Sequence, residues 1–152
     1  MANSFLEMVR SRVLLADGAT GTELLASGWS GHVSIAALED RDRVLNLHEE
    51  YLRAGADLFL TDTFAANRIQ LTRFGSAERV REINFQASRI ARDAREIMGV
   101  PSFIGGSVGP IGRDLAVGAV TSEQAHDAFV EQMRMSRISS QLIREHTGIS
   151  VE

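Results

Sequence analysis

The sequence predicts an α/β protein built around a parallel sheet. Short apolar runs at 12–16, 56–61 and 102–106 are each interpreted as a strand, and helical patterns lie between them. When strands and helices alternate, right-handed crossovers place successive strands side by side and parallel. About 45 residues separate the start of one strand from the next, which favours a barrel with long loops over a compact open sheet.

Capping signals and apolar spacing predict the first helices. Ser4 and Glu7 resemble a capping box, so we expect a brief helix before the first strand. A second short helix, over 23–27, follows that strand and ends near Gly28. The apolar residues of the segment 29–35 recur with no clear period, so it is interpreted as a loop.

Longer helices are predicted over 40–54, 80–97 and 124–135. The last of them begins with a capping box formed by Thr121 and Gln124. The middle one carries the strongest apolar stripe, with steps of three and four residues that are typical of a helix packed on a sheet. This stripe consists of Val80, Ile83, Ala87, Ile90, Ala94 and Ile97.

The composition is that of one soluble domain, with 152 residues of which 44% are hydrophobic and 24% are charged. No apolar run approaches the roughly 18 residues of a membrane span, and residues 1–12 are too polar for a secretory signal, so we expect a cytoplasmic protein. A net charge of −4 does not attract nucleic acid or an anionic membrane. The absence of cysteine excludes disulfides, thiol nucleophiles and thiolate metal ligands within this chain.

The loop after the first strand is the most informative stretch, because Asp17, Gly18, Ala19 and Thr20 lead there into a helix. Backbone N–H groups at such a junction lack intrahelical partners and attract an anion. Asp17 adds an acceptor-only carboxylate, so the loop suits a zwitterionic amino acid, with its ammonium on Asp17 and its carboxylate on the amides. Two alternatives stay open: a tight turn in which Asp17 caps the helix, and a phosphate-binding loop of another barrel enzyme.

Polar side chains also follow the other two strands. Asp62 and Thr63 come after the second strand, and Ser107 comes after the third. The carboxyl ends of parallel strands form the ligand face of α/β folds, so we expect all three strand ends to converge there.

Other side chains that can bind ligands are interpreted as structural. The histidines are scattered, with no pair at helical i, i+4 spacing, so we expect surface or capping roles and no metal site. They are His32, His48, His126 and His146. Aromatic residues within apolar patterns are expected in the core, namely Phe59, Phe64, Phe74 and Phe103. Arg68 and Arg73 lie where an anionic methyl donor could bind, but they are interpreted as exposed helix arginines.

Several segments together resemble the homocysteine S-methyltransferase family. They are LLADGATGTELLASG at 14–28, YLRAGADLFLTDTFAANRIQL at 51–71, VREINFQASRIARDAREI at 80–97 and FIGGSVGPIGR at 103–113. The similarity covers roughly residues 13–133 and is densest to the form fused to a methylenetetrahydrofolate reductase domain. The order and spacing of several motifs make it specific, whereas the glycine pair alone is a weak signal.

This resemblance implies a (β/α)8 (TIM) barrel, of which the chain carries about the first three β/α units. It also implies binding of homocysteine and transfer of a methyl group to its sulfur, which gives methionine. In that family the residue matching Asp17 contacts the substrate amine, and the amides matching Gly18, Ala19 and Thr20 hold the carboxylate. The resemblance further places three residues at the strand mouths: Asp62, Thr63 and Ser107.

The family holds a zinc ion with three cysteines from later strands, and this chain has no cysteine. We therefore expect no metal ligands and no turnover from this chain alone. The methyl donor stays open, whether a folate, a cobalamin-linked group or an S-methyl compound. Three strands cannot close a barrel, so a non-catalytic half-barrel that pairs with a complementary half or with itself is the alternative.

The chain departs from the family pattern in two places. The family usually has Thr-Asn-Thr-Phe-Gly where residues 61–65 are Thr-Asp-Thr-Phe-Ala, so a carboxylate replaces an amide and alanine replaces glycine. The next strand motif is absent after Met133. We interpret 1–133 as the N-terminal part of the barrel and 134–152 as a divergent tail, from a truncated or frame-shifted reading frame or a cut fragment.

Overall fold

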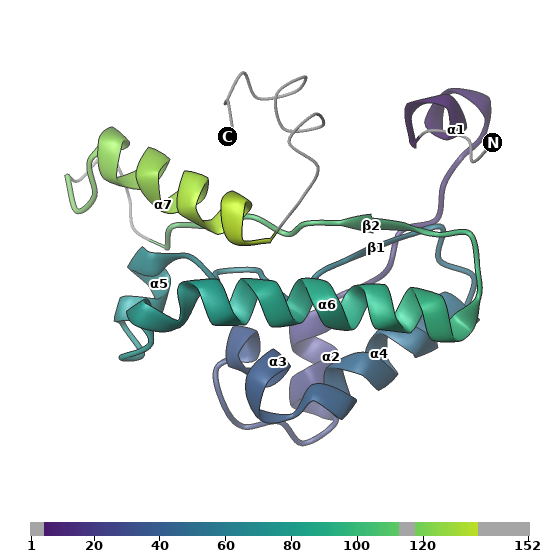
Figure 1. Ribbon diagram of the computed structural model, residues 1–152, viewed down its shortest axis with the longest axis horizontal. Helices are drawn as coiled ribbons and strands as arrows, with labels where there is room; N and C mark the ends of the chain where they lie inside the picture. The colour runs from purple at the N-terminus through teal and green to yellow at the C-terminus, as the bar shows by residue number, and fades with distance from the viewer. Residues whose placement is uncertain (1–4, 113–117, 137–152) are drawn as a thin grey trace.

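A computed structural model describes residues 5–112 and 118–136 (Figure 1). The α-helices there are α1 (Phe5–Ser11), α2 (Thr20–Ala26), α3 (Ala36–Glu39), α4 (Arg41–Arg53), α5 (Arg68–Thr72), α6 (Val80–Met98) and α7 (Ser122–Met135). The strands are β1 (Leu58–Leu60) and β2 (Phe103–Gly105), and the 3-10 turns are η1 (Val33–Ile35) and η2 (Ala77–Arg79).

The strands β1 and β2 pair in parallel, with Leu58 opposite Phe103 and Leu60 opposite Gly105. Ala16 forms a parallel bridge to Leu58, and the backbone N–H of Asp17 donates to the carbonyl of Leu58 at 2.9 Å. The three predicted strand segments therefore lie side by side in parallel, which confirms the α/β class.

The first predicted strand, 12–16, is shorter than expected and is reduced to this bridge. The carboxylate of Asp57 takes the place of a backbone acceptor here, because its Oδ2 accepts from the N–H of Leu15 at 3.0 Å. The same carboxylate pairs with Arg12, with its Oδ1 2.6 Å from Nη2. A side chain therefore replaces part of the ladder that would have extended the strand.

One core cluster lies among α2, α3, α4 and α6, and a second lies between β1 and the helices α4 and α6. Figure 1 shows α6 running along the strands, and it packs against α3, α4 and α7. Phe59 of β1 is fully buried against Leu52 of α4 and against Ala91 and Ala94 of α6. This apolar contact fixes the sheet on the helices and so positions the strand ends.

Capping interactions are present at the ends of the long helices. The carboxylate of Asp40 accepts from the N–H of Arg43 at 3.2 Å and begins α4, and Gly99 ends α6 with a φ of +62°. Both bonds of the capping box form at α7, between Thr121 and Gln124. The stripe on α6 is buried up to Ala94.

The short elements differ more from the prediction. Ile97, the last residue of the expected stripe on α6, is 61% exposed. The predicted loop 29–35 contains η1 and leads into α3, and α5 has no counterpart in the prediction. The helix α1 is confirmed, but its expected cap, Ser4, lies outside the described residues.

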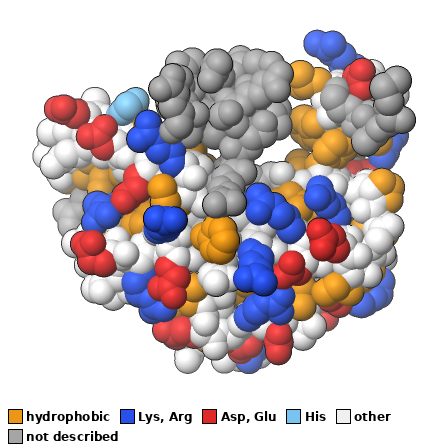
Figure 2. Space-filling model, viewed as in Figure 1, with side chains coloured by type: hydrophobic (Ala, Val, Ile, Leu, Met, Phe, Trp, Pro, Cys, Tyr) orange, Lys and Arg blue, Asp and Glu red, His pale blue; other side chains and the backbone are white. Residues whose placement is uncertain are grey.

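The surface that α6 presents carries charges of both signs. Figure 2 shows acidic and basic side chains interspersed over this face, so it has no broad basic patch. Within the part of the chain that the structure describes, no helix is long and apolar enough to cross a membrane.

Candidate functional site

The segments that follow β1 and β2 are joined by side-chain hydrogen bonds. The hydroxyl of Thr63 donates to the carbonyl of Ser107 at 2.7 Å, and the N–H of Ser107 donates to the hydroxyl of Thr61 at 3.1 Å. The hydroxyls of Thr61 and Thr63 are themselves 2.7 Å apart. The structure thus brings Thr63 and Ser107 together at the carboxyl ends of β1 and β2, as the strand order predicts.

Asp17 is bonded to the same sheet. Its Oδ2 accepts from the N–H of Leu60 at 2.9 Å, directly before the segment that begins at Thr61. Partial burial raises the pKa of Asp17, and the N–H of Leu60 opposes this effect. The alternative in which Asp17 caps the helix is wrong, because Ala19 is the N-cap of α2 and no side chain caps it.

The loop between Asp17 and α2 presents free backbone donors. The N–H groups of Gly18 and Ala19 have no acceptor among the described residues. A Cβ on Gly18 would lie 2.7 Å from the hydroxyl oxygen of Tyr51, so the loop passes close to α4 at this point. Since α2 has only seven residues, an anion at this loop would be held by these local amides rather than by a helix dipole.

Asp62 is buried at the end of β1. It is 2% exposed, and its Oδ2 has no hydrogen-bond partner among the described residues. Burial raises the pKa of Asp62 to about 7. The carboxyl group that replaces the usual asparagine is therefore held largely in its neutral form below that pH, and its proton makes it a donor as an amide is.

Ala65 has a left-handed backbone, with a φ of +64°. The family usually has glycine here, and glycine adopts this conformation without a steric cost. The N–H of Ala65 donates to the carbonyl of Gly109 at 2.8 Å, so the turn ties the segment after β1 to the loop after β2. The alanine thus imposes strain on the loop that carries Asp62 and Thr63.

Gln132 is a residue of this site that the sequence analysis missed. It is fully buried on α7, and its Nε2 donates to the carbonyl of Thr63 at 2.7 Å and approaches that of Ser107 at 3.4 Å. A signal was present, because Gln132 follows Ala125 and Ala128 on the buried face of a predicted helix.

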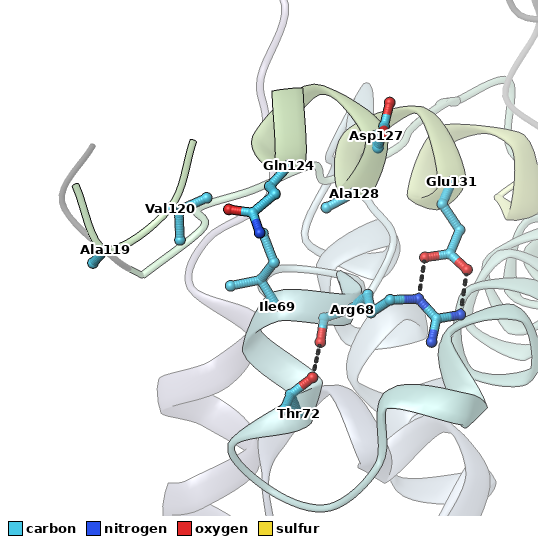
Figure 3. Close-up of a pocket in the computed structure, with 9 residues that line it drawn as sticks. All are labelled: Arg68, Ile69, Thr72, Ala119, Val120, Gln124, Asp127, Ala128 and Glu131. Carbon is cyan, nitrogen blue, oxygen red and sulfur yellow. Dashed lines mark hydrogen bonds and ion pairs between the residues drawn. The ribbon is translucent and has the colours of Figure 1, made fainter. Parts of the chain in front are cut away.

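A separate groove of about 660 Å³ lies between α5 and α7 (Figure 3). The guanidinium of Arg68 lies in this groove, where its Nε and Nη2 donate to the carboxylate of Glu131 at 3.1 and 2.7 Å. It also donates to Glu78 at 3.2 Å. Arg68 is therefore an exposed helix arginine, as predicted, and its guanidinium is paired with carboxylates. None of the predicted site residues lines the groove.

His48 contradicts the prediction of a surface or capping role. It is fully buried, with its ring centroid 5.2 Å from that of Phe59, and neither ring nitrogen has a partner among the described residues. Burial lowers its pKa to about 4, so the ring is neutral at pH 7. It lies on the buried face of α4 with Val44 and Leu52, a face that the apolar spacing did predict.

The other predictions for histidines and aromatic residues have mixed outcomes. Phe59 is in the core as expected, but Phe64 and Phe74 are 62% and 52% exposed, so the expectation for them is wrong. Both lie in turns beyond the sheet, where apolar neighbours in the sequence do not become neighbours in space. His146 lies outside the described residues.

The zinc ligands that the family resemblance implies do not match the side chains of this chain. The sequence has no cysteine, and no three histidine, aspartate or glutamate side chains come together as a metal site in the residues that the structure describes. The described part of the chain therefore offers no set of side chains that would hold a metal ion.

Comparisons with known proteins agree with this parallel α/β architecture and its loops. The metallated form of the homocysteine methyltransferase MmuM from Escherichia coli superposes with a TM-score of 0.68 at 25% identity, over 84% of this chain and 51% of that one. The oxidized form of MmuM gives 0.63 at 22% identity, over 91% and 61%. The fold is thus part of a TIM-barrel-like α/β structure.

The family follows from the sequence comparisons. The model of the homocysteine S-methyltransferase family matches residues 14–147, so the chain belongs to this family. Methionine synthase from Mycobacterium tuberculosis is 30% identical over 138 residues, and that from Mycobacterium leprae is 29% identical over 137 residues. Each match covers 83% of this chain, which spans only 12% and 11% of the length of those relatives.

Proposed function

We propose that this chain provides the amino-acid-binding part of a homocysteine S-methyltransferase. The observation that carries the proposal is the position of Asp17, whose carboxylate is bonded to β1 beside the free amides of Gly18 and Ala19. An acceptor and adjacent donors match the two charged groups of an amino acid. Membership of the family makes homocysteine the expected ligand.

In this proposal each part of the ligand has a separate contact. The ammonium binds the carboxylate of Asp17, and the carboxylate binds the amides of Gly18, Ala19 and Thr20. The thiol-bearing side chain then extends toward the strand ends, where Asp62, Thr63 and Ser107 lie. The hydroxyl of Thr63 is already bonded to the carbonyl of Ser107 at 2.7 Å, so these two residues would form a fixed side of the binding site.

Binding alone does not methylate the ligand. A free thiol has a pKa near 8.5, so only a minority of homocysteine is a thiolate at pH 7. Activation of the sulfur needs groups that this chain does not contain, because it has no cysteine for the family's zinc. We therefore propose that the chain binds homocysteine without turnover, with residues 1–133 as the barrel part and 134–152 as a divergent tail. A parent fused to a reductase domain is part of the same proposal.

Exposed apolar residues support a second candidate function, an interaction fragment that pairs with a complementary half-barrel or with itself. Val13 and Leu15 are 91% and 57% exposed along the segment that forms only a bridge to β1. Such an unpaired edge is a template for association with another chain. Sedimentation velocity at several concentrations tests this candidate, and a monomer at every concentration contradicts self-association.

A titration with homocysteine and inorganic phosphate tests the principal proposal. We expect saturable binding of homocysteine that phosphate does not displace. Binding of phosphate without binding of homocysteine would instead support the phosphate-binding alternative for the first loop.

A further inference from the structure

Gln132 joins the ends of two strands that lie far from it in the sequence. Its Nε2 is 2.7 Å from the carbonyl oxygen of Thr63, after β1, and 3.4 Å from that of Ser107, after β2. The side chain is fully buried, so water does not compete for these bonds. One side-chain amide from α7 therefore donates hydrogen bonds to the segments that follow both strands.

We propose that Gln132 is a positioning residue, which fixes the spacing of the strand ends that form one wall of the site. The expected effect on homocysteine binding rests on the proposed function, whereas the expected effect on the spacing of the strand ends does not. The bonds from Thr63 to Ser107 and from Ser107 to Thr61 close a polar ring at the same place. Loss of the amide would leave the buried carbonyl of Thr63 with only the bond from the N–H of Ala66 at 3.0 Å, and nothing among the described residues would then join it to α7.

A second bond network anchors α7 one turn further on and provides the control. The hydroxyl of Ser136 lies 3.2 Å from Oδ1 of Asn84, whose Nδ2 donates to the carbonyl of Ala66 at 2.8 Å. Ser136 and Gln132 are four residues apart, so they lie on the same face of the helix. The hydroxyl of Ser136 contacts Asn84 of α6 and, at 3.0 Å, the backbone carbonyl of Gln132, but not the strand ends. Its removal therefore tests α7 packing while the link through the Gln132 side chain stays in place.

Two substitutions at position 132 separate length from hydrogen bonding. Gln132→Met keeps an unbranched side chain of similar length but removes the donor. Gln132→Glu keeps the shape and donates only when it is protonated. A purely space-filling role predicts that Gln132→Met resembles the natural chain, whereas a positioning role predicts that it does not.

Amide hydrogen exchange in the whole 152-residue chain is the primary measurement. We expect Gln132→Met to accelerate exchange at Thr61 and Ser107 by at least about 10-fold, with changes below about 2-fold in α4 and α6. Ser136→Ala should leave Thr61 and Ser107 within about 2-fold of the natural chain. In Gln132→Glu, protection at Ser107 should recover as the pH falls, which a space-filling side chain would not produce.

The affinity for homocysteine is the second measurement, and it keeps the two proposals apart. Gln132→Met should weaken binding by about 10-fold, and Ser136→Ala should not. Unchanged exchange at Thr61 and Ser107, or equal acceleration throughout the chain, would overturn the positioning role. Accelerated exchange in a chain that binds no homocysteine would overturn the proposed function and leave the role of Gln132 intact.

Discussion

The carboxylate of Asp17 accepts a hydrogen bond from the backbone N–H of Leu60 at 2.9 Å, which fixes the first loop to the last residue of β1. The next residues, Thr61 to Thr63, are bonded in turn to Ser107 after β2. A continuous set of bonds therefore runs from the loop at Asp17 to the ends of both strands. The proposed site depends on this relationship.

Asp62→Asn should stabilise the chain above pH 7. In the unfolded chain this carboxyl group ionises near pH 3.8, whereas the folded chain keeps the proton until about pH 7. The neutral form therefore favours folding fully below pH 3.8, and this contribution is lost as the pH rises to about 7. Asparagine does not titrate, so the variant should gain about 2–4 kcal/mol at pH 8 and almost nothing at pH 4.

Urea unfolding of both proteins from pH 4 to pH 8 measures this difference. His48 contributes in the opposite direction, because its lowered pKa makes stability fall as the pH falls from 6.5 to about 4. That contribution is common to both proteins and cancels when their free energies of unfolding are subtracted. A difference that does not vary with pH would show that Asp62 is ionised in the folded chain.

Ala65→Gly should stabilise the loop after β1. The φ of +64° is costly for alanine and ordinary for glycine, and part of the gain is offset by the greater freedom of glycine in the unfolded chain. We expect a net gain of about 0.5–1 kcal/mol in the free energy of unfolding. Ala66→Gly is the matched control, because Ala66 is fully buried and has no positive φ. This variant should have a lower free energy of unfolding than the natural chain. Equal destabilisation by both changes would refute the strain.

Gly18→Ala should disturb the first loop, because its new methyl group would lie 2.7 Å from the hydroxyl oxygen of Tyr51. Either the loop or the ring must move, at a cost of about 1–3 kcal/mol. Tyr51→Phe removes the hydroxyl, so the double variant should be more stable than the sum of the single changes predicts. A double-mutant cycle of thermal unfolding measures this coupling, and strict additivity would mean that the two groups do not meet.

The sequence predicted the long elements well because their signals are local. The capping box at Thr121 and the apolar stripe of α6 specify helices without reference to the rest of the fold. The first strand was overestimated because an apolar run does not show that the side chain of Asp57 replaces a backbone acceptor.

Residues whose role depends on distant partners could not be assigned in this way. Gln132 acts on Thr63 across 69 positions, a separation that no periodic pattern reports. The burial of His48 was available in principle, since it shares a face with apolar residues of α4, but its chemistry suggested the surface. The strain at Ala65 and the burial that keeps the carboxyl of Asp62 neutral depend on the folded structure, although the departures from the family pattern marked both positions.

Calorimetric titration of homocysteine into the natural chain, Asp17→Ala and Asp42→Ala tests the central claim most directly. Asp42 is an aspartate at the start of α4 with an 85% exposed side chain, so its removal controls for the loss of one negative charge. We predict that Asp17→Ala weakens binding by about 10- to 100-fold, as expected for a charge-assisted hydrogen bond, and that Asp42→Ala leaves the affinity unchanged. Equal affinities of Asp17→Ala and the natural chain would contradict the account.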